Sequence, residues 1–170
     1  MIIAVAILAF VTMERVAELF LDRRHTARLI ARGAREYAPG HYRWIVALHV
    51  AWLAGLWLLA WDRPVRWPWF AAFAVLQALR VWVLATLGER WTTRIIVLPG
   101  EPLVRAGPYR FLSHPNYAVV VGEIAVLPLV FGLPWYALVF SILNATILSI
   151  RISAENSALA GASDPPTRLA

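Results

Sequence analysis

The sequence predicts an all-α integral membrane protein with about five transmembrane helices. Of its 170 residues, 61% are hydrophobic and only 15% are charged, whereas a soluble domain is roughly 45–50% apolar. The mean hydropathy is +0.64. The apolar residues fall into stretches close to the roughly 20 residues that cross a bilayer core. From this length we expect no separate soluble catalytic domain, and we expect any site to be formed by these helices and their loops.

Five apolar stretches are expected to form the transmembrane helices, at residues 2–21, 43–61, 67–87, 117–131 and 135–150. The last two form one apolar run that is too long for a single helix. Gly132 and Pro134 interrupt that run and predict a tight helical hairpin. The first stretch has no cationic leader and no small-residue cleavage site, so we expect it to be retained rather than removed as a signal peptide.

Residues 1–160 are expected to form a single transmembrane domain. Residues 161–170 are small, polar and contain proline, so they are expected to form a flexible cytoplasmic tail.

Arginine supplies all 16 of the basic residues, and cysteine is absent. Lysine Schiff-base chemistry, disulfides and cysteine nucleophiles are therefore excluded. Twelve arginines lie in the segments 22–43 and 88–116 and in the C-terminal part, against Arg63 and Arg66 on the opposite side. The positive-inside rule then places the N-terminus outside a bacterial-type inner membrane, with the C-terminus and the active site in the cytoplasm. Membrane lipids, rather than nucleic acid, are the expected partners of these arginines.

Several polar side chains lie inside the predicted spans, where they are costly and normally face a bundle interior or an aqueous cavity. They are Glu14, Arg15, Glu18, Arg80 and Glu123, with the neutral His49, Gln77 and Asn144. Glu14 and Glu18 share a helix face and would repel unless a cation lies between them or one is protonated. Two interpretations stay open: snorkelling and structural ion pairs, or the lining of a site.

The segment 88–118 is expected to be an ordered cytoplasmic loop rich in aromatics and arginines. Three prolines and two glycines between Pro99 and Pro108 prevent a helix. Pro115 suits the first position of the next helix, which makes His114 its N-cap, where free backbone N–H groups attract an anionic group. The loop is either structural packing or the wall of a pocket for a polar cofactor.

Arg151 and Glu155 form a second constellation at the cytoplasmic end of the last span. Their separation of four residues puts them on one helix face. An intrahelical ion pair and a functional pair both explain this spacing, and a carboxylate in the last helical turn opposes the helix dipole.

Metal and hydrolase chemistry lack their residues in this sequence. The four histidines, at positions 25, 41, 49 and 114, show neither His-x3-His nor His-Glu-x-x-His spacing, so no metal site is expected. A Gly-x-Ser-x-Gly elbow and a Gly-x4-Gly-Lys phosphate loop are also absent.

The loop and the last span together resemble the isoprenylcysteine carboxyl methyltransferase family. The matching pattern is Leu103-Val104-x2-Gly107-Pro108-Tyr109-Arg110-x3-His114-Pro115-x-Tyr117, followed by Arg151-x3-Glu155. The N-terminal part, from Glu14 to Glu18 and from Arg24 to Glu36, resembles the short bacterial branch, which is associated with alkylpyrone and alkylresorcinol products. The resemblance implies a transmembrane methyltransferase domain that uses S-adenosylmethionine without a Rossmann domain.

The resemblance also implies roles for individual residues. The cofactor would be held by Glu101, Pro102, Leu103, Val104, Tyr109, His114, Pro115, Asn116, Tyr117 and Glu155. Arg151 would bind the methyl acceptor, and Arg151 and Glu155 would be the catalytic residues. The implied activity is an O-methyltransferase acting on a small lipophilic acceptor, either an alkylated phenol or pyrone or a prenylcysteine-type carboxylate. A phenol or enol must lose a proton, and Glu14, Glu18, Glu123 and His114 are open candidates for that step.

Some positions depart from the eukaryotic enzymes of this family. Glu101 stands where they have histidine, Ser113 where they have arginine, and Glu155-Asn156 where they have a run of glutamates. These departures favour an alkylated phenol or pyrone over prenylcysteine. Two alternatives are an NADPH-dependent membrane reductase, because that group has a similar His-Pro-Asn-Tyr element, and a non-enzymatic membrane scaffold.

Overall fold

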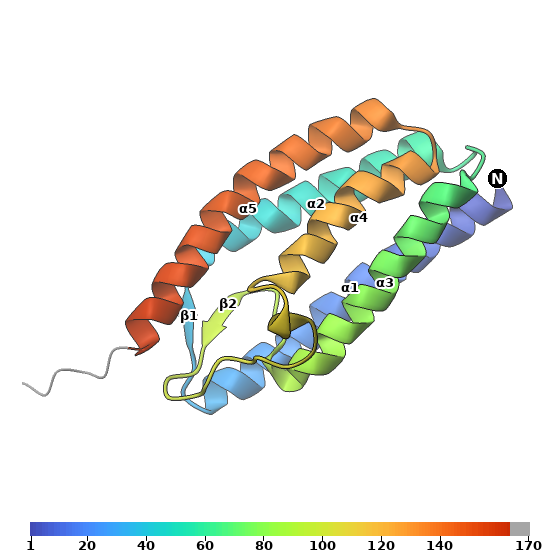
Figure 1. Cartoon of the computed structure of the whole chain (residues 1–170). Helices are drawn as coiled ribbons and strands as arrows, with labels where there is room; N and C mark the ends of the chain where they lie inside the picture. Colours follow the sequence, from blue (N-terminus) through green and yellow to red (C-terminus); the bar gives the residue numbers. More distant parts are fainter. Residues whose placement is uncertain (164–170) are drawn as a thin grey trace, which may run out of the picture.

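The computed structural model describes residues 1–163, except for the side chains of His41 and of residues 159–163. Five α-helices run along one long axis, with a two-stranded ribbon at one end (Figure 1). The helices are α1 Ile2–Ala31, α2 Pro39–Ala60, α3 Trp67–Leu87, α4 Pro115–Val130 and α5 Pro134–Ser163. Two short 3-10 turns, η1 Gly88–Arg90 and η2 Gly107–Arg110, and the strands β1 Arg35–Tyr37 and β2 Ile95–Val97 complete the fold.

Each of the five predicted apolar stretches forms a helix, but α1 and α5 are longer than predicted. Residues 22–31 belong to α1, although the arginine-rich segment that begins at Asp22 was expected to be a loop. No proline or glycine occurs between Asp22 and Ala31 to end the helix. At the other end of the chain, α5 includes residues 161–163 of the predicted tail. The rest of that tail, 164–170, lies outside the described residues.

The predicted hairpin between α4 and α5 is confirmed. The N–H of Leu133 donates to the Pro128 carbonyl at 3.0 Å, and the N–H of Gly132 donates to the Leu129 carbonyl at 3.1 Å. This is a Schellman motif, in which the residue after the C-cap takes a left-handed conformation. Gly132 has that conformation, with φ +70°. Pro134 then starts α5 at once.

Helix α4 lies between α3 and α5, and its inner face packs into the core of the bundle (Figure 1). The core cluster draws on α1, α2, α3 and α4, with Leu8, Leu56, Phe73, Ile124 and Leu127 among its buried members.

The ribbon β1–β2 was not predicted. Its strands pair antiparallel, with Arg35 opposite Val97 and Tyr37 opposite Ile95. The buried side chains of Ile95 and Val97 pack against Ala158 of α5. Strands of three residues are too short to give a clear alternating pattern in a sequence. The ribbon ties the α1–α2 connection to the loop between α3 and α4.

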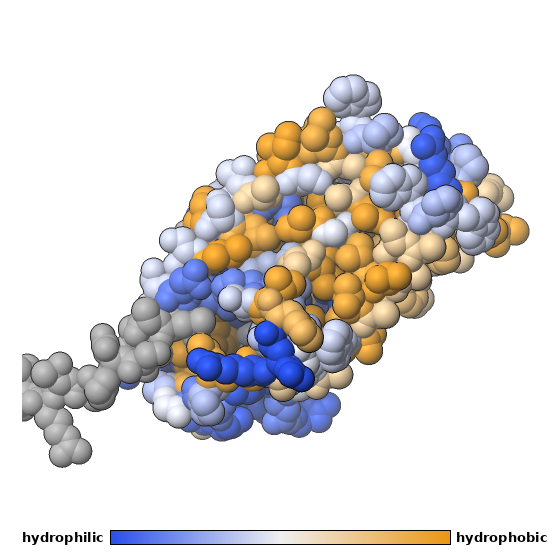
Figure 2. Space-filling model, in the orientation of Figure 1, coloured by the Kyte–Doolittle hydropathy of each residue, from blue (hydrophilic) through white to orange (hydrophobic). Residues whose placement is uncertain are grey.

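The surface divides along the long axis. Hydrophobic side chains cover the middle of the molecule, and hydrophilic ones gather at its ends (Figure 2). Among the described residues, three helical segments are long and apolar enough to cross a membrane: Tyr42–Ala60, Trp67–Arg90 and Pro134–Ala158. Helix α4 is apolar but shorter, and α1 carries three charged residues within its first 18. The chain is an all-α integral membrane protein, as predicted.

Candidate active site

A cavity of about 570 Å³ lies at the end of the bundle that carries β1 and β2. This volume is within the range of about 300–1,000 Å³ that holds cofactors and other small molecules. Its walls come from the loop between α3 and α4, from the first turn of α4 and from residues 151–156 of α5. The charged residues that line it are Arg90, Arg94, Arg105, Arg151, Glu101 and Glu155. We call this space the polar cavity.

The extension of α1 anchors one wall of the polar cavity. The carboxylate of Asp22, which is only 1% exposed, accepts the backbone N–H of Thr93 at 2.6 Å. Nδ1 of His25 lies 2.8 Å from the carbonyl oxygen of Trp91, and it must donate there because a carbonyl only accepts. These two buried side chains fix the loop just before β2.

The first turn of α4 forms a second wall. His114 is the N-cap and Pro115 occupies the first turn, as the sequence predicted. The His114 and Tyr117 rings stack with centroids 5.3 Å apart, and Nε2 of His114 lies 3.2 Å from Oδ1 of Asn156 on α5. Oδ1 of Asn116 and the indole N–H of Trp91 are buried without a hydrogen-bond partner among the described residues. Two polar groups of this wall therefore have unused hydrogen-bonding capacity, although neither atom reaches the cavity surface.

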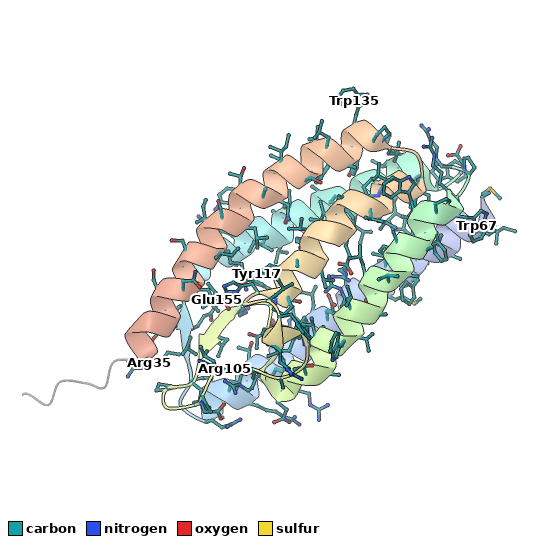
Figure 3. The ribbon with its side chains drawn as sticks, viewed as in Figure 1. Arg35, Trp67, Arg105, Tyr117, Trp135 and Glu155 are labelled. Atoms are coloured by element: carbon teal, nitrogen blue, oxygen red, sulfur yellow. The ribbon has the colours of Figure 1, made fainter. Side chains whose placement is uncertain are left out.

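Tyr117 links Arg151 to Glu155. The Nε of Arg151 donates to the Tyr117 hydroxyl at 2.8 Å, and that hydroxyl donates to the Glu155 carboxylate. Nη2 of Arg151 also donates to the Thr93 carbonyl at 2.6 Å. Figure 3 shows Tyr117 and Glu155 close together beside the loop. The direct Arg151–Glu155 ion pair that the helix spacing suggested is absent from the described residues, because the phenol lies between the two charges.

Tyr109 adds a neutral hydroxyl to the polar cavity. Burial, together with the negative charge of Glu155, raises the pKa of Tyr109 to about 12. The phenol therefore stays protonated at neutral pH.

A second cavity of about 170 Å³ lies between the helices. Four residues line both cavities and thus form a common wall: Trp91, Asn116, Tyr117 and Arg151. The remaining lining is mainly apolar and includes one face of α2. Leu19 on α1 and Val50 on α2 also line this space and are 39% and 62% exposed, so it opens toward the apolar surface between these helices. We call this space the inner cavity.

A buried ionic cluster adjoins the inner cavity. Arg80, only 3% exposed, donates through Nε to Glu123 at 2.7 Å and through Nη1 to Glu18 at 2.7 Å. Arg15 pairs with Glu14 and with Glu18, each at 2.9 Å. The polar residues of the spans are therefore structurally paired, and three of them, Arg15, Glu18 and Arg80, also line the inner cavity.

Comparison with known proteins identifies the family. The profile of the isoprenylcysteine carboxyl methyltransferase family matches residues 69–161. The chain belongs to this family. It is 38% identical to YpbQ of Bacillus subtilis strain 168 over 159 residues. The aligned region covers 90% of this chain and 94% of YpbQ. It is 28% identical over 151 residues to a protein of Haemophilus influenzae, covering 85% and 88% of the two chains. Both relatives are described only as uncharacterized, and no solved structure gives a significant match.

The membrane methyltransferase brings most of its motif residues to the polar cavity. The predicted residues that line it are Glu101, Leu103, Val104, Tyr109, His114, Asn116, Tyr117, Arg151 and Glu155. Pro102 and Pro115 do not line it. The carbonyl of Pro102 accepts a hydrogen bond from Arg90 at 2.9 Å, and Pro115 is buried at the start of α4. Both prolines shape the chain that forms the wall.

Several lining residues of the methyltransferase were not identified in the sequence. Trp91, the strand β2 and Asn156 all face the polar cavity. Asp22 and His25, which hold the loop, were also missed, although their separation by three residues on one helix face was visible in the sequence. The strand gave no such signal, because its contact with β1 joins segments that are far apart in the chain.

Gly107 fixes the position of the methyltransferase loop against α3. Its φ is +54°, and a Cβ at this position would collide with Oγ1 of Thr86 and come within 3.1 Å of Nε1 of Trp82. We expect Gly107→Ala to cost about 1–3 kcal/mol locally and to loosen the loop. Trypsin cleavage in detergent at Arg105 and Arg110 should then become roughly tenfold faster, because local opening exposes these sites.

The control for this variant is Gly40→Ala, since a Cβ at Gly40 meets no atom within 4 Å. Its cleavage rate should equal that of the wild type. Equal rates for Gly107→Ala and the wild type would contradict the role given to Gly107.

Proposed function

We propose that the protein is an S-adenosylmethionine-dependent O-methyltransferase of the short bacterial branch, which acts on a lipophilic acceptor such as an alkylated phenol or pyrone. The common wall of the two cavities carries this proposal. One cavity is lined by many charged residues and lies at the arginine-rich end, and the other has a mainly apolar lining and lies within the bundle. A methyl group can pass between a polar donor and a lipophilic acceptor only where two such spaces meet.

The lining of the polar cavity fits the proposed cofactor. S-adenosylmethionine carries a carboxylate, an ammonium group, a sulfonium and an adenine, and when bound it supplies an electrophilic methyl group. Glu155 can bind a positive group, whereas Glu101 already pairs with Arg32 and Arg90. The N-terminus of α4, beside His114, and the lining arginines can bind the carboxylate. Leu103, Val104 and β2 offer an apolar surface for the base.

The inner cavity supports a lipophilic acceptor that enters from the bilayer. Arg151 lines this cavity, and its Nη1 makes no hydrogen bond to the described residues. That N–H can orient the oxygen that receives the methyl group. Holding the acceptor oxygen in line with the methyl group supplies much of the rate in such a transfer.

The candidates for proton removal from a phenol or enol are narrowed by position. Of Glu14, Glu18, Glu123 and His114, only Glu18 lines the inner cavity. Each of its carboxylate oxygens pairs with one arginine, Oε1 with Arg80 and Oε2 with Arg15, and keeps a second lone pair. With a phenol or enol as acceptor, Glu18 would take the proton that the acceptor oxygen loses as the methyl group arrives. A carboxylate acceptor needs no such base.

The arrangement of the arginines supports an active site on the cytoplasmic side. Arg35 and Arg105 lie at the end that carries the polar cavity, and Trp67 and Trp135 lie at the other end with the N-terminus (Figures 1 and 3). An excess of arginine marks cytoplasmic loops, and tryptophans gather at membrane interfaces.

Titration calorimetry of the detergent-purified protein tests the cofactor directly, with S-adenosylhomocysteine and NADPH as separate ligands. We expect the wild type to bind S-adenosylhomocysteine and not NADPH, and His114→Ala to weaken this binding. With S-adenosylmethionine that carries a labelled methyl group, alkylresorcinols, alkylpyrones and alkylphenols should become labelled. Binding of NADPH alone would instead favour a reductase, and binding of neither ligand would favour a scaffold.

A further inference from the structure

The inner cavity has a second polar region away from the common wall. His49 on α2 and Asn144 on α5 both line it. Asn144 precedes Arg151 of the common wall by seven residues. His49 follows Tyr42, whose hydroxyl accepts from Thr93 at 3.2 Å, also by seven residues. Each therefore lies about 10 Å further along its helix than Arg151 or Tyr42, at 1.5 Å per residue. The two helices run in opposite directions, so both residues lie at the inner end of the cavity.

The side chains of His49 and Asn144 have unused hydrogen-bonding capacity. Asn144 is only 4% exposed, and its amide makes no hydrogen bond to the described residues. Nδ1 of His49 lies 2.8 Å from the Ile45 carbonyl and must donate to it, which leaves Nε2 as an acceptor without a partner in the described part of the chain. Buried polar groups without partners are costly, most of all inside a membrane. A ligand hydroxyl could donate to Nε2 of His49 and accept from the Asn144 amide.

The neighbouring charges determine which kind of ligand group fits. Glu14, Glu18 and Glu123 oppose only Arg15 and Arg80 in the buried ionic cluster, so its formal charge is −1. An anion at the inner end would meet this excess negative charge. A neutral oxygen function, a hydroxyl or a carbonyl, would not.

We infer that the inner end of this cavity recognises a second, neutral oxygen of the acceptor, distinct from the oxygen that is methylated, and that His49 and Asn144 bind it. This inference rests on the proposed function. The two oxygens need not be far apart. Side chains on a helix lean toward its N-terminus, so Arg151 on α5 leans inward and His49 on α2 leans toward the common wall, whereas Asn144 on α5 leans away from that wall. The acceptor therefore carries two oxygen functions and a lipophilic part, which would leave between α1 and α2, beside Leu19 and Val50.

The test compares a 5-alkylresorcinol with the 3-alkylphenol of the same chain length, because the two compounds differ by one hydroxyl. We expect the wild type to prefer the resorcinol by about tenfold or more in kcat/KM, as a site built to bind a hydroxyl rejects the analogue that lacks it. Asn144→Leu and His49→Phe should remove most of this preference, because each should raise KM for the resorcinol. The kcat and the affinity for S-adenosylhomocysteine should change little.

Thr146→Val is the matched control, since it removes a polar group from an exposed position on the same helix. It should keep the wild-type preference.

The dissociation constants of the 5-alkylresorcinol and of the 3-alkylphenol are also measured, by calorimetry without cofactor, with the wild type and the variants in lipid nanodiscs. If no compound is methylated but the wild type binds the resorcinol more tightly and Asn144→Leu does not, the methyltransferase proposal fails, and only the assignment of His49 and Asn144 as an oxygen-binding site of the inner cavity holds. The inference would be overturned by equal kcat/KM values of the wild type for the two compounds. It would also be overturned if both Asn144→Leu and His49→Phe kept the wild-type preference for the resorcinol.

Discussion

Replacing Arg80 by methionine is expected to destabilise the protein by about 3–5 kcal/mol, the usual cost of removing one partner of a buried ion pair. Arg80 bonds Glu123 through two nitrogens and Glu18 through a third. Without it, the buried carboxylates of Glu18 and Glu123 and the partly buried Glu14 face Arg15 alone. The measurement is the free energy of unfolding in detergent, or the melting temperature where unfolding is irreversible.

Arg28→Met is the matched control for Arg80→Met. Arg28 pairs with Glu89 at the surface, with both side chains more than 40% exposed, and such pairs contribute no more than about 1 kcal/mol. The double variant Arg80→Met, Glu123→Gln should regain part of the lost stability, because it also removes one unpaired charge. Equal effects of Arg80→Met and Arg28→Met would show that the buried cluster contributes little to stability.

Glu155→Gln is expected to weaken the binding of S-adenosylhomocysteine roughly 10- to 100-fold, since a hydrogen bond to a charged group contributes about 1.5–3 kcal/mol. The amide keeps the size of the side chain and can still accept from Tyr117, so the wall of the polar cavity should stay in place. Only the negative charge that would face the ammonium group of the ligand is lost. Titration calorimetry in detergent gives the dissociation constant of S-adenosylhomocysteine for the wild type and for Glu155→Gln.

The corresponding control is Glu89→Gln, which makes the same chemical change at an exposed carboxylate on η1. Its affinity for S-adenosylhomocysteine should match that of the wild type. An unchanged affinity in Glu155→Gln, with a normal melting temperature, would remove Glu155 from the cofactor site.

Local sequence signals predicted most of the fold. Hydropathy located all five helices, because each contains a continuous apolar stretch, and three of them are long and apolar enough to cross a membrane. Gly132 and Pro134 predicted the α4–α5 turn, which the Schellman motif confirms. Pro115 likewise predicted the start of α4 and the cap at His114. In each case the residues that determine the structure are neighbours in the chain.

The sequence by itself determined the membrane fold, the family motif and the chemical types of the site residues. Only the tertiary structure decided how these residues meet. It put the Tyr117 phenol between Arg151 and Glu155, extended α1 so that Asp22 holds Thr93, and brought His49 and Asn144 to one cavity. The physical reason is that these contacts join segments 34 to 95 positions apart in the chain. Helix periodicity and hydropathy report only on neighbours within a few turns, so they carry no information about such pairs.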